Sequence, residues 1–148
     1  MIELLKRLSK TIVSRAGPYS THDPETGMVV EQHLEKGVLH CTDGKPALIW
    51  RDPETNLVTR EEYYEHGVLH RTGGKPALIW RDPETNVVID EKYYENGRYH
   101  RIKGCPAVIC RDPKTGDVTY ESFYEDGKAV ALEREIKQTP KRAVLTPL

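Results

Sequence analysis

The amino-acid sequence predicts an all-β fold: an elongated antiparallel meander sheet of 30-residue β-hairpin repeats, preceded by an N-terminal amphipathic helix. Three observations predict it: an internal repeat, two kinds of turn motif that recur in every copy, and β-branched and aromatic residues between the turns. Residues 31–56 and 61–86 are identical at 20 of 26 positions, and residues 91–116 match the second copy at 15 of 26. Such a period is typical of repeat proteins, in which each unit buries its apolar face against its neighbours.

A helix is predicted for the first unit of the chain, residues 1–15. Hydrophobic residues recur with α-helical spacing over about residues 2–14. They are Ile2, Leu4, Leu5, Leu8 and Ile12. We expect this helix to cap the first exposed strand edge or to lie on one face of the sheet, because open edges invite aggregation. Binding to a partner helix or to a membrane surface is the alternative role.

The first turn motif is the pentapeptide Asp-Pro-x-Thr-Gly/Asn, found at residues 23–27, 52–56, 82–86 and 112–116. The Asp side chain accepts hydrogen bonds from the following amides, and Pro fixes φ of the first turn residue. Gly and Asn best tolerate the left-handed conformation that ends a type I turn with a bulge. Each pentapeptide therefore predicts a hairpin reversal.

A second reversal is predicted where Gly recurs, at residues 36–37, 66–67, 96–97 and 126–127. Two of these pairs are Asn-Gly and Asp-Gly, the strongest two-residue hairpin signals. The segments between reversals, such as 57–65 and 87–95, are rich in β-branched and aromatic residues and are predicted to be strands.

One arm of each hairpin is longer than the other by a five-residue stretch, at 42–46, 72–76 and 102–106. We expect these stretches to be bends or bulges that interrupt one long strand, since their proline donates no amide to a ladder. Two reversals per repeat restore the chain direction, so about nine antiparallel strands follow, with an advance of ~10 Å per repeat. The predicted sheet covers residues 16–133, and residues 134–148 are predicted to be a C-terminal tail.

The motifs around the second reversal resemble a known family. Residues 63–71 and 93–101 are similar to MORN-type β-hairpin repeats, and closer still to bacterial and phage variants with a Gly-x-x-His-Arg…Gly-x-Pro-Ala consensus. The resemblance covers roughly residues 28–127, but the period is longer than usual and Cys41 stands where Arg is expected. It implies a binding or assembly module, of a kind associated with membranes or with toxin–antitoxin systems, and no single biochemical activity.

Charge and cysteine content exclude several classes. The net charge is −1, but residues 1–16 and 128–148 each carry +3, which leaves −7 for the repeat region. An acidic body lacks the basic stripe that nucleic-acid binding requires. Cys41, Cys105 and Cys110 form no CxxC pair, which favours a reducing compartment. Because the N-terminal apolar run is too short for a signal peptide or a membrane span, we expect a cytoplasmic protein.

Rows of polar residues recur with the repeat and are expected to be structural. The histidine row, His40, His70 and His100, has ~10 Å between neighbours, too far to share one zinc ion. We expect each imidazole to hydrogen-bond within its bend, with a ligand-contacting row as the alternative. The row of Glu31, Glu61, Glu91 and Glu121 is expected to pair across strands with Arg51, Arg81 and Arg111. No nucleophile, phosphate-loop or metalloprotease motif occurs, so we expect no enzyme, no cofactor and no metal.

A single-layer sheet cannot bury both faces, so exposed aromatic residues suit partner recognition. The predicted partner-binding residues are Trp50, Trp80, Tyr64, Tyr94, Tyr124, His40, His70, His100, Lys45 and Lys75. We predict a non-catalytic protein-interaction module of a bacterial or phage inhibitor, antitoxin or immunity type, whose acidic body suits a basic protein partner. The alternative is a membrane- or lipid-associated scaffold that uses the basic terminal segments. A homodimer through the sheet edges or the helix is left open.

Overall fold

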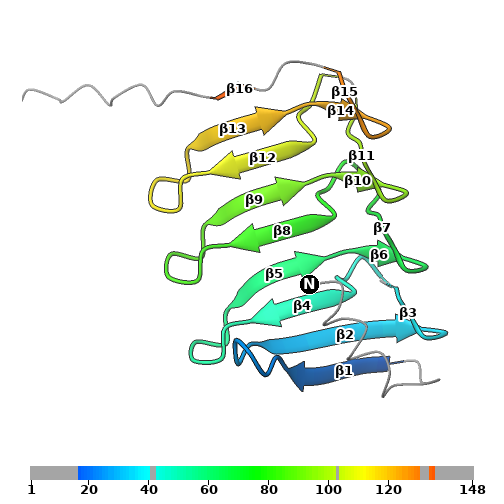
Figure 1. Cartoon of the computed structure of the whole chain (residues 1–148), viewed down its shortest axis with the longest axis vertical. Coiled ribbons are helices and arrows are strands. Elements are labelled where there is room, and N and C mark those ends of the chain that lie inside the picture. The colour runs from blue at the N-terminus through cyan, green and yellow to red at the C-terminus, as the bar shows by residue number, and fades with distance from the viewer. Residues whose placement is uncertain (1–16, 41–42, 103, 131–133, 136–148) are drawn as a thin grey trace, which may run out of the picture.

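A long antiparallel sheet forms the body of the protein in the computed structural model, which describes residues 17–40, 43–102, 104–130 and 134–135 (Figure 1). Its strands follow the chain order without crossovers, which confirms the predicted all-β antiparallel meander. The strands are β1 (Gly17–His22), β2 (Val29–Glu35), β4 (Leu48–Arg51), β5 (Val58–Glu62), β8 (Leu78–Arg81), β9 (Val88–Lys92), β12 (Val108–Arg111), β13 (Val118–Ser122) and β16 (Arg134–Glu135), with β3 (Val38–Leu39) paired to the end of β2.

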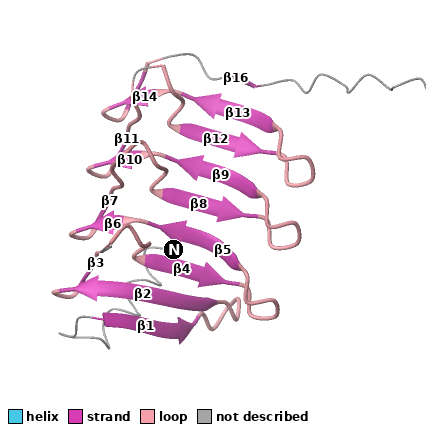
Figure 2. Ribbon diagram, turned by 180° about the vertical axis from the view of Figure 1, so that it is seen from behind, coloured by secondary structure: helices cyan, strands magenta, loops and turns pink. Residues whose placement is uncertain are grey.

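A column of short hairpins runs along one side of this sheet, opposite the Asp-Pro turns (Figure 2). The hairpins are β6 (Tyr64–Glu65) with β7 (Val68–Leu69), β10 (Tyr94–Glu95) with β11 (Arg98–Tyr99), and β14 (Tyr124–Glu125) with β15 (Lys128–Ala129). Each hairpin is tied to the one before it by a backbone hydrogen bond, as where the Gly97 amide donates to the Leu69 carbonyl at 2.9 Å. The first of these reversals, between β2 and β3, belongs to the main sheet, and each later one stacks on its predecessor instead of extending that sheet.

The Asp-Pro turns have the predicted geometry. In the second and third of them the Asp carboxylate accepts the amide of the Thr three residues on, at 2.8 Å from Thr55 to Asp52 and at 2.8 Å from Thr85 to Asp82. The last residue of each turn has positive φ, 59° at Asn56 and 75° at Gly116, which confirms the left-handed position. These turns are local devices that need no tertiary contact to form.

The turn carboxylates make stability sensitive to acid. The amide of the Thr three residues on, the largest cause, holds the pKa of Asp52, Asp82 and Asp112 below the ordinary value of 3.8. Because the folded-state pKa is depressed, the stabilisation is present above about pH 4 and is lost as the pH falls through the folded-state pKa. We expect the triple variant D52N/D82N/D112N to show a weaker fall in Tm on acidification below pH ~4 than the wild type. Parallel acid dependence in both proteins, followed by circular dichroism, would contradict this.

The second reversals are two-residue turns with positive φ at both central positions, for example 48° at His66 and 79° at Gly67. This is the type I′ geometry that matches the twist of a hairpin. It confirms the reversals predicted from the recurring Gly.

The strands between the turns differ from the prediction in two ways. The segments 57–65 and 87–95 are each split into two strands. In the first of them Tyr63 lies between β5 and β6 and bonds to two different segments: its amide donates to the Ala77 carbonyl, and its carbonyl accepts from the His70 amide. The predicted excursion at 72–76 is longer than expected and covers the whole connection from β7 to β8. The two pieces of the predicted long strand consequently lie in different sheets.

The sheet extends past its predicted C-terminal limit. Strand β16 pairs with β13, with Glu135 opposite Tyr120, so pairing continues past the expected limit at residue 133. The helix predicted over 2–14 lies outside the described residues, as do Cys41 and the C-terminal tail from residue 136 onward.

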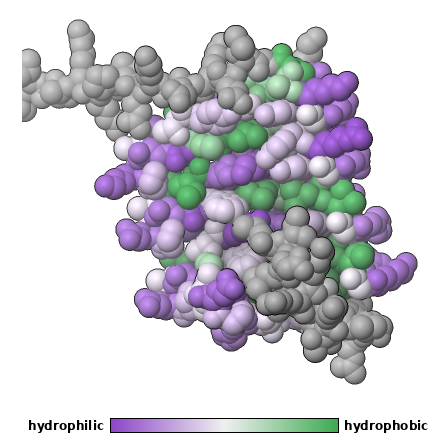
Figure 3. Space-filling view, viewed as in Figure 1, coloured by the Kyte–Doolittle hydropathy of each residue, from purple (hydrophilic) through white to green (hydrophobic). Residues whose placement is uncertain are grey.

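Successive strand residues point to opposite faces, so the main sheet has two distinct surfaces. We call the face with Trp50, Arg60 and Trp80 in register the tryptophan face, and the face with Glu31, Glu61, Glu91 and Glu121 the glutamate face. Figure 3 shows hydrophobic residues across the middle of one side of the molecule, with hydrophilic residues at both margins. The buried apolar residues are Val30, Ala47, Leu48, Trp50, Tyr63, Ala77, Leu78, Tyr93, Ala107, Val108 and Ile109.

Candidate functional site

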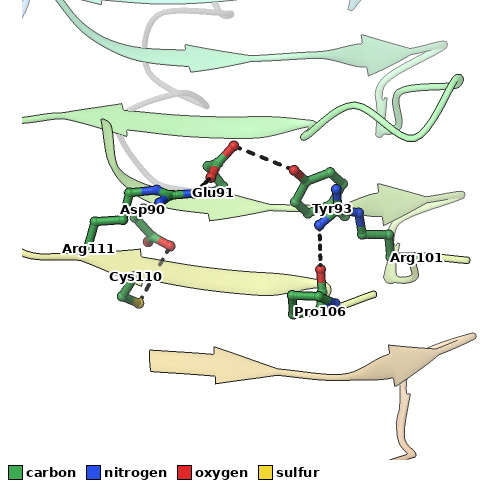
Figure 4. Close-up of polar contacts among 7 residues, drawn as sticks. All are labelled: Asp90, Glu91, Tyr93, Arg101, Pro106, Cys110 and Arg111. Carbon is green, nitrogen blue, oxygen red and sulfur yellow. Dashed lines mark hydrogen bonds and ion pairs between the residues drawn. The ribbon is translucent and has the colours of Figure 1, made fainter. Parts of the chain in front are cut away.

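The glutamate face is a ladder of ion pairs between neighbouring strands. Arg51 reaches Glu31 at 2.6 Å, and Arg111 reaches Glu91 at 3.0 Å (Figure 4). The equivalent pair of Arg81 and Glu61 is at 3.4 Å. The predicted pairing of the glutamate row with arginines across the strands is confirmed for Glu31, Glu61 and Glu91, whose charges have an architectural role.

The Arg of the His-Arg motif fastens the excursion that follows it. Arg71 donates to the Pro76 carbonyl at 3.0 Å, and its guanidinium lies 3.4 Å from the centre of the Tyr63 ring. Arg101 donates to the Pro106 carbonyl at the same distance, as Figure 4 shows. Stacking on the ring and hydrogen bonding to the carbonyl together hold each proline-containing bend against the strand before it.

The histidine row links successive repeats. The His70 Nδ1 atom accepts a hydrogen bond from the Asn96 amide, 26 residues on, at 3.0 Å. Its Nε2 atom faces Glu65 at 3.4 Å. His40 and His100 make the same contacts with the amides of His66 and Asp126. Each imidazole therefore acts as a latch to the next hairpin. The predicted hydrogen bonding of the histidines is confirmed, but the bond joins two repeats and does not lie within one bend as expected.

Removal of one latch should have a modest effect. We expect H70A to lower the free energy of unfolding by about 0.5–1.5 kcal/mol, because the Asn96 amide loses its acceptor. H70N should recover most of this loss, since the Asn side chain can place an oxygen near the position of Nδ1. Urea denaturation compares the three proteins. Equal stability of H70A and the wild type would show that the latch contributes nothing in solution.

The tryptophan face carries an open groove at the end of the sheet next to the Asp-Pro turns, with a volume of about 880 Å³. Trp50 and Trp80 line it from two strands that are not neighbours, and Trp80 is more exposed than Trp50, which is 8% exposed. Arg60 on the strand between them stands directly opposite both, and its guanidinium lies 6.0 Å from the Trp50 ring centre and 4.8 Å from that of Trp80. We call this surface the tryptophan groove.

A buried polar chain fixes Arg60 within the groove. The guanidinium pairs with the Glu62 carboxylate at 2.5 Å, and the Tyr64 hydroxyl donates to the same carboxylate at 2.6 Å. Glu62 is only 3% exposed. Burial, and then the negative charge of Glu62, raises the pKa of Tyr64 far above its ordinary value, so the phenol stays protonated as a donor.

The rim of the tryptophan groove is acidic and rich in proline. Its acidic lining residues are Glu25, Asp52 and Glu54, together with Asp23, which is buried and hydrogen-bonded within its own turn. Pro53 and Pro83 form exposed walls on the turns. The lining cations, Arg60 and Arg81, already face Glu62 and Glu61 respectively. The groove therefore combines an aromatic floor with a rim whose acidic groups are suited to a cation.

The ten residues predicted to bind a partner do not form one site. Only Trp50 and Trp80 line the tryptophan groove. The hairpin column holds Tyr94 and Tyr124, which contact Tyr99 at ring-centre distances of 4.4 and 5.1 Å. Tyr64 is held by Glu62, the histidines are engaged as latches, and Lys45 and Lys75 lie exposed on the excursions.

Sequence reasoning missed the residues that complete the groove, Arg60 above all. Between Trp50 and Arg51 the register with β5 shifts by one residue, and this bulge places Arg60 rather than Thr59 opposite Trp50. A hairpin of this turn type is expected to contain such a bulge. If the bulge is included when strand positions are counted from the turn, Arg60 falls opposite Trp50.

Comparison of the chain with protein-family models, with curated proteins and with solved structures gave no match. The likeness to MORN-type repeats thus rests on the sequence motifs alone. The described residues contain no group of three or more His, Cys, Asp or Glu placed to hold a metal ion. Within that same part of the chain, no helix is long and apolar enough to cross a bilayer.

Proposed function

We propose that the protein is a non-catalytic interaction module that binds a basic partner protein through the tryptophan groove. The observation that carries the proposal is the position of Trp50 and Trp80 in one open groove with an acidic rim. Tryptophan is enriched among the residues that dominate binding energy, and an acidic rim steers a basic partner towards it. The periodic His, Arg and Glu rows have structural partners, which supports a binding role over a catalytic one.

Within this class, we propose an inhibitor, antitoxin or immunity-type role in the cytoplasm of a bacterium or in phage infection. The support is the resemblance of the repeats to bacterial and phage variants, together with the acidic repeat region. A linear array of similar, hydrogen-bonded hairpins suits this role, because a preorganised surface loses little entropy on binding.

The experiment is affinity capture from the native host with wild-type protein and two matched variants. Glu54 and Glu84 occupy the same position in identical Asp-Pro-Glu-Thr-Asn turns, but only Glu54 lines the groove. We expect a partner protein that binds the wild type and E84K equally and binds E54K at least tenfold more weakly, because the charge reversal repels a basic partner.

Two outcomes would overturn this function. A partner that binds E54K and E84K equally would place its interface outside the tryptophan groove. Co-sedimentation with anionic vesicles that is lost on deletion of residues 1–15 would favour the membrane-associated scaffold instead.

A further inference from the structure

We propose that the tryptophan groove binds an extended, basic, proline-containing segment of its partner in the polyproline II conformation. The segment runs across the strands, from Trp50 to Trp80. This inference rests on the proposed function and names the chemistry of the bound segment.

The spacing of the two indoles carries the proposal. Trp50 and Trp80 both pair with Arg60, so they stand two strands apart on one face. Two inter-strand spacings amount to about 9.6 Å. One turn of a polyproline II helix is three residues and about 9.3 Å long, so the spacing of residues i and i+3 matches that of the two indoles. Trp80 is the more exposed of the two, and Trp50 is 8% exposed.

The residue between the indoles discriminates against a bound α-helix. An α-helix that reached both indoles would contact them with residues about two turns apart. Its side chains at i+3 and i+4, about 4.5–6 Å along the helix axis, would then lie on the same face between the two contacts. In the tryptophan groove that position is taken by Arg60, which is held in place by Glu62 at 2.5 Å. A polyproline II segment has no residue on the same face between i and i+3, so it can lie over Arg60.

The remaining groove chemistry fits such a segment. Pro53 and Pro83 line the groove beside the indoles, and aromatic-lined grooves are the established receptors for proline-rich segments. The acidic groups on the rim, among them Asp52 and Glu54, suit Lys or Arg at the positions of the segment that point away from the indoles. Asp52 stays ionised because hydrogen bonds from Thr55 lower its pKa.

The test uses synthetic peptides and the full chain labelled with ¹⁵N. The protein has two tryptophans, so two indole N–H signals report on the two ends of the groove. We expect the acetylated and amidated peptide (Pro-Pro-Lys)₄ to shift both signals. The peptide (Pro-Pro-Glu)₄, of opposite charge, and (Gly-Ser-Lys)₄, of equal charge without polyproline II structure, should each bind at least tenfold more weakly.

Protein variants complete the test. E54K should weaken binding of (Pro-Pro-Lys)₄ at least tenfold, and its matched control E84K should bind as the wild type does. Equal binding of (Gly-Ser-Lys)₄ and (Pro-Pro-Lys)₄ would overturn the proposal, since charge alone would then explain the contact. No shift of either indole signal with (Pro-Pro-Lys)₄ would overturn it as well.

The two proposals fail in distinguishable ways. If the native partner is captured by the wild type and by E84K but not by E54K, while (Pro-Pro-Lys)₄ leaves both indole signals unchanged, the interaction function stands and the polyproline II inference falls. If E54K affects neither the partner nor the peptide, both fall.

Discussion

Replacement of Leu48 by alanine is expected to lower the free energy of unfolding by about 2–5 kcal/mol, the range for a fully buried leucine. Leu48 is 0% exposed and packs in a cluster with Val30 and Trp50. A thin repeat sheet has few such residues, so one cavity removes a large share of its apolar packing. The loss should be visible as a lower urea midpoint with an unchanged denaturant slope.

The chain offers a matched control for this experiment. Leu57 is 39% exposed, and L57A should change stability by no more than about 0.5 kcal/mol. Similar effects of L48A and L57A would show that Leu48 is open to solvent and that the tryptophan face is not covered at this position.

The second large effect is expected at Glu62. Substitution E62Q removes the charge that Arg60 faces at 2.5 Å in a site where Glu62 is 3% exposed. Loss of one partner from a buried ion pair costs about 3–5 kcal/mol, and we expect a value of about 3 kcal/mol because Gln can still hydrogen-bond to Tyr64. Chemical denaturation measures the change.

The adjacent glutamate is the control for the same chemistry on the other face. Glu61 pairs with Arg81 at 3.4 Å, and both side chains are more exposed, at 20% and 29%. We expect E61Q to cost at most about 1 kcal/mol. In a double-mutant cycle, E62Q combined with R60M should be less destabilising than the sum of the single changes. Strict additivity would mean that the two side chains do not interact in solution.

Much of the fold could be predicted because its signals are local. The Asp-Pro turn contains every group it needs within five residues, so Asp52 to Asn56 has the expected hydrogen bonds and φ angles. The pairing of Arg51 with Glu31 could also be predicted, because a fixed repeat puts unlike charges on neighbouring strands at constant spacing.

The tryptophan groove could be predicted only in part. Trp50 and Trp80, which have matching positions in the repeat, line one groove, whereas Tyr64 and the histidines, predicted together with them, make their contacts outside it. Face assignment depends on register, and the extra residue Thr59 in β5 moves every later residue of that strand to the opposite face from the one that simple alternation gives.

The sequence by itself determined the repeat, both reversals and the antiparallel order of the strands, since these follow from turn chemistry and period. Only the tertiary structure decided that the second reversals leave the sheet as a stacked column, where each His latches the next hairpin. It also decided that Arg60 stands between the two indoles. Both outcomes depend on contacts between residues that are distant in the chain, and a one-residue change of register would abolish them.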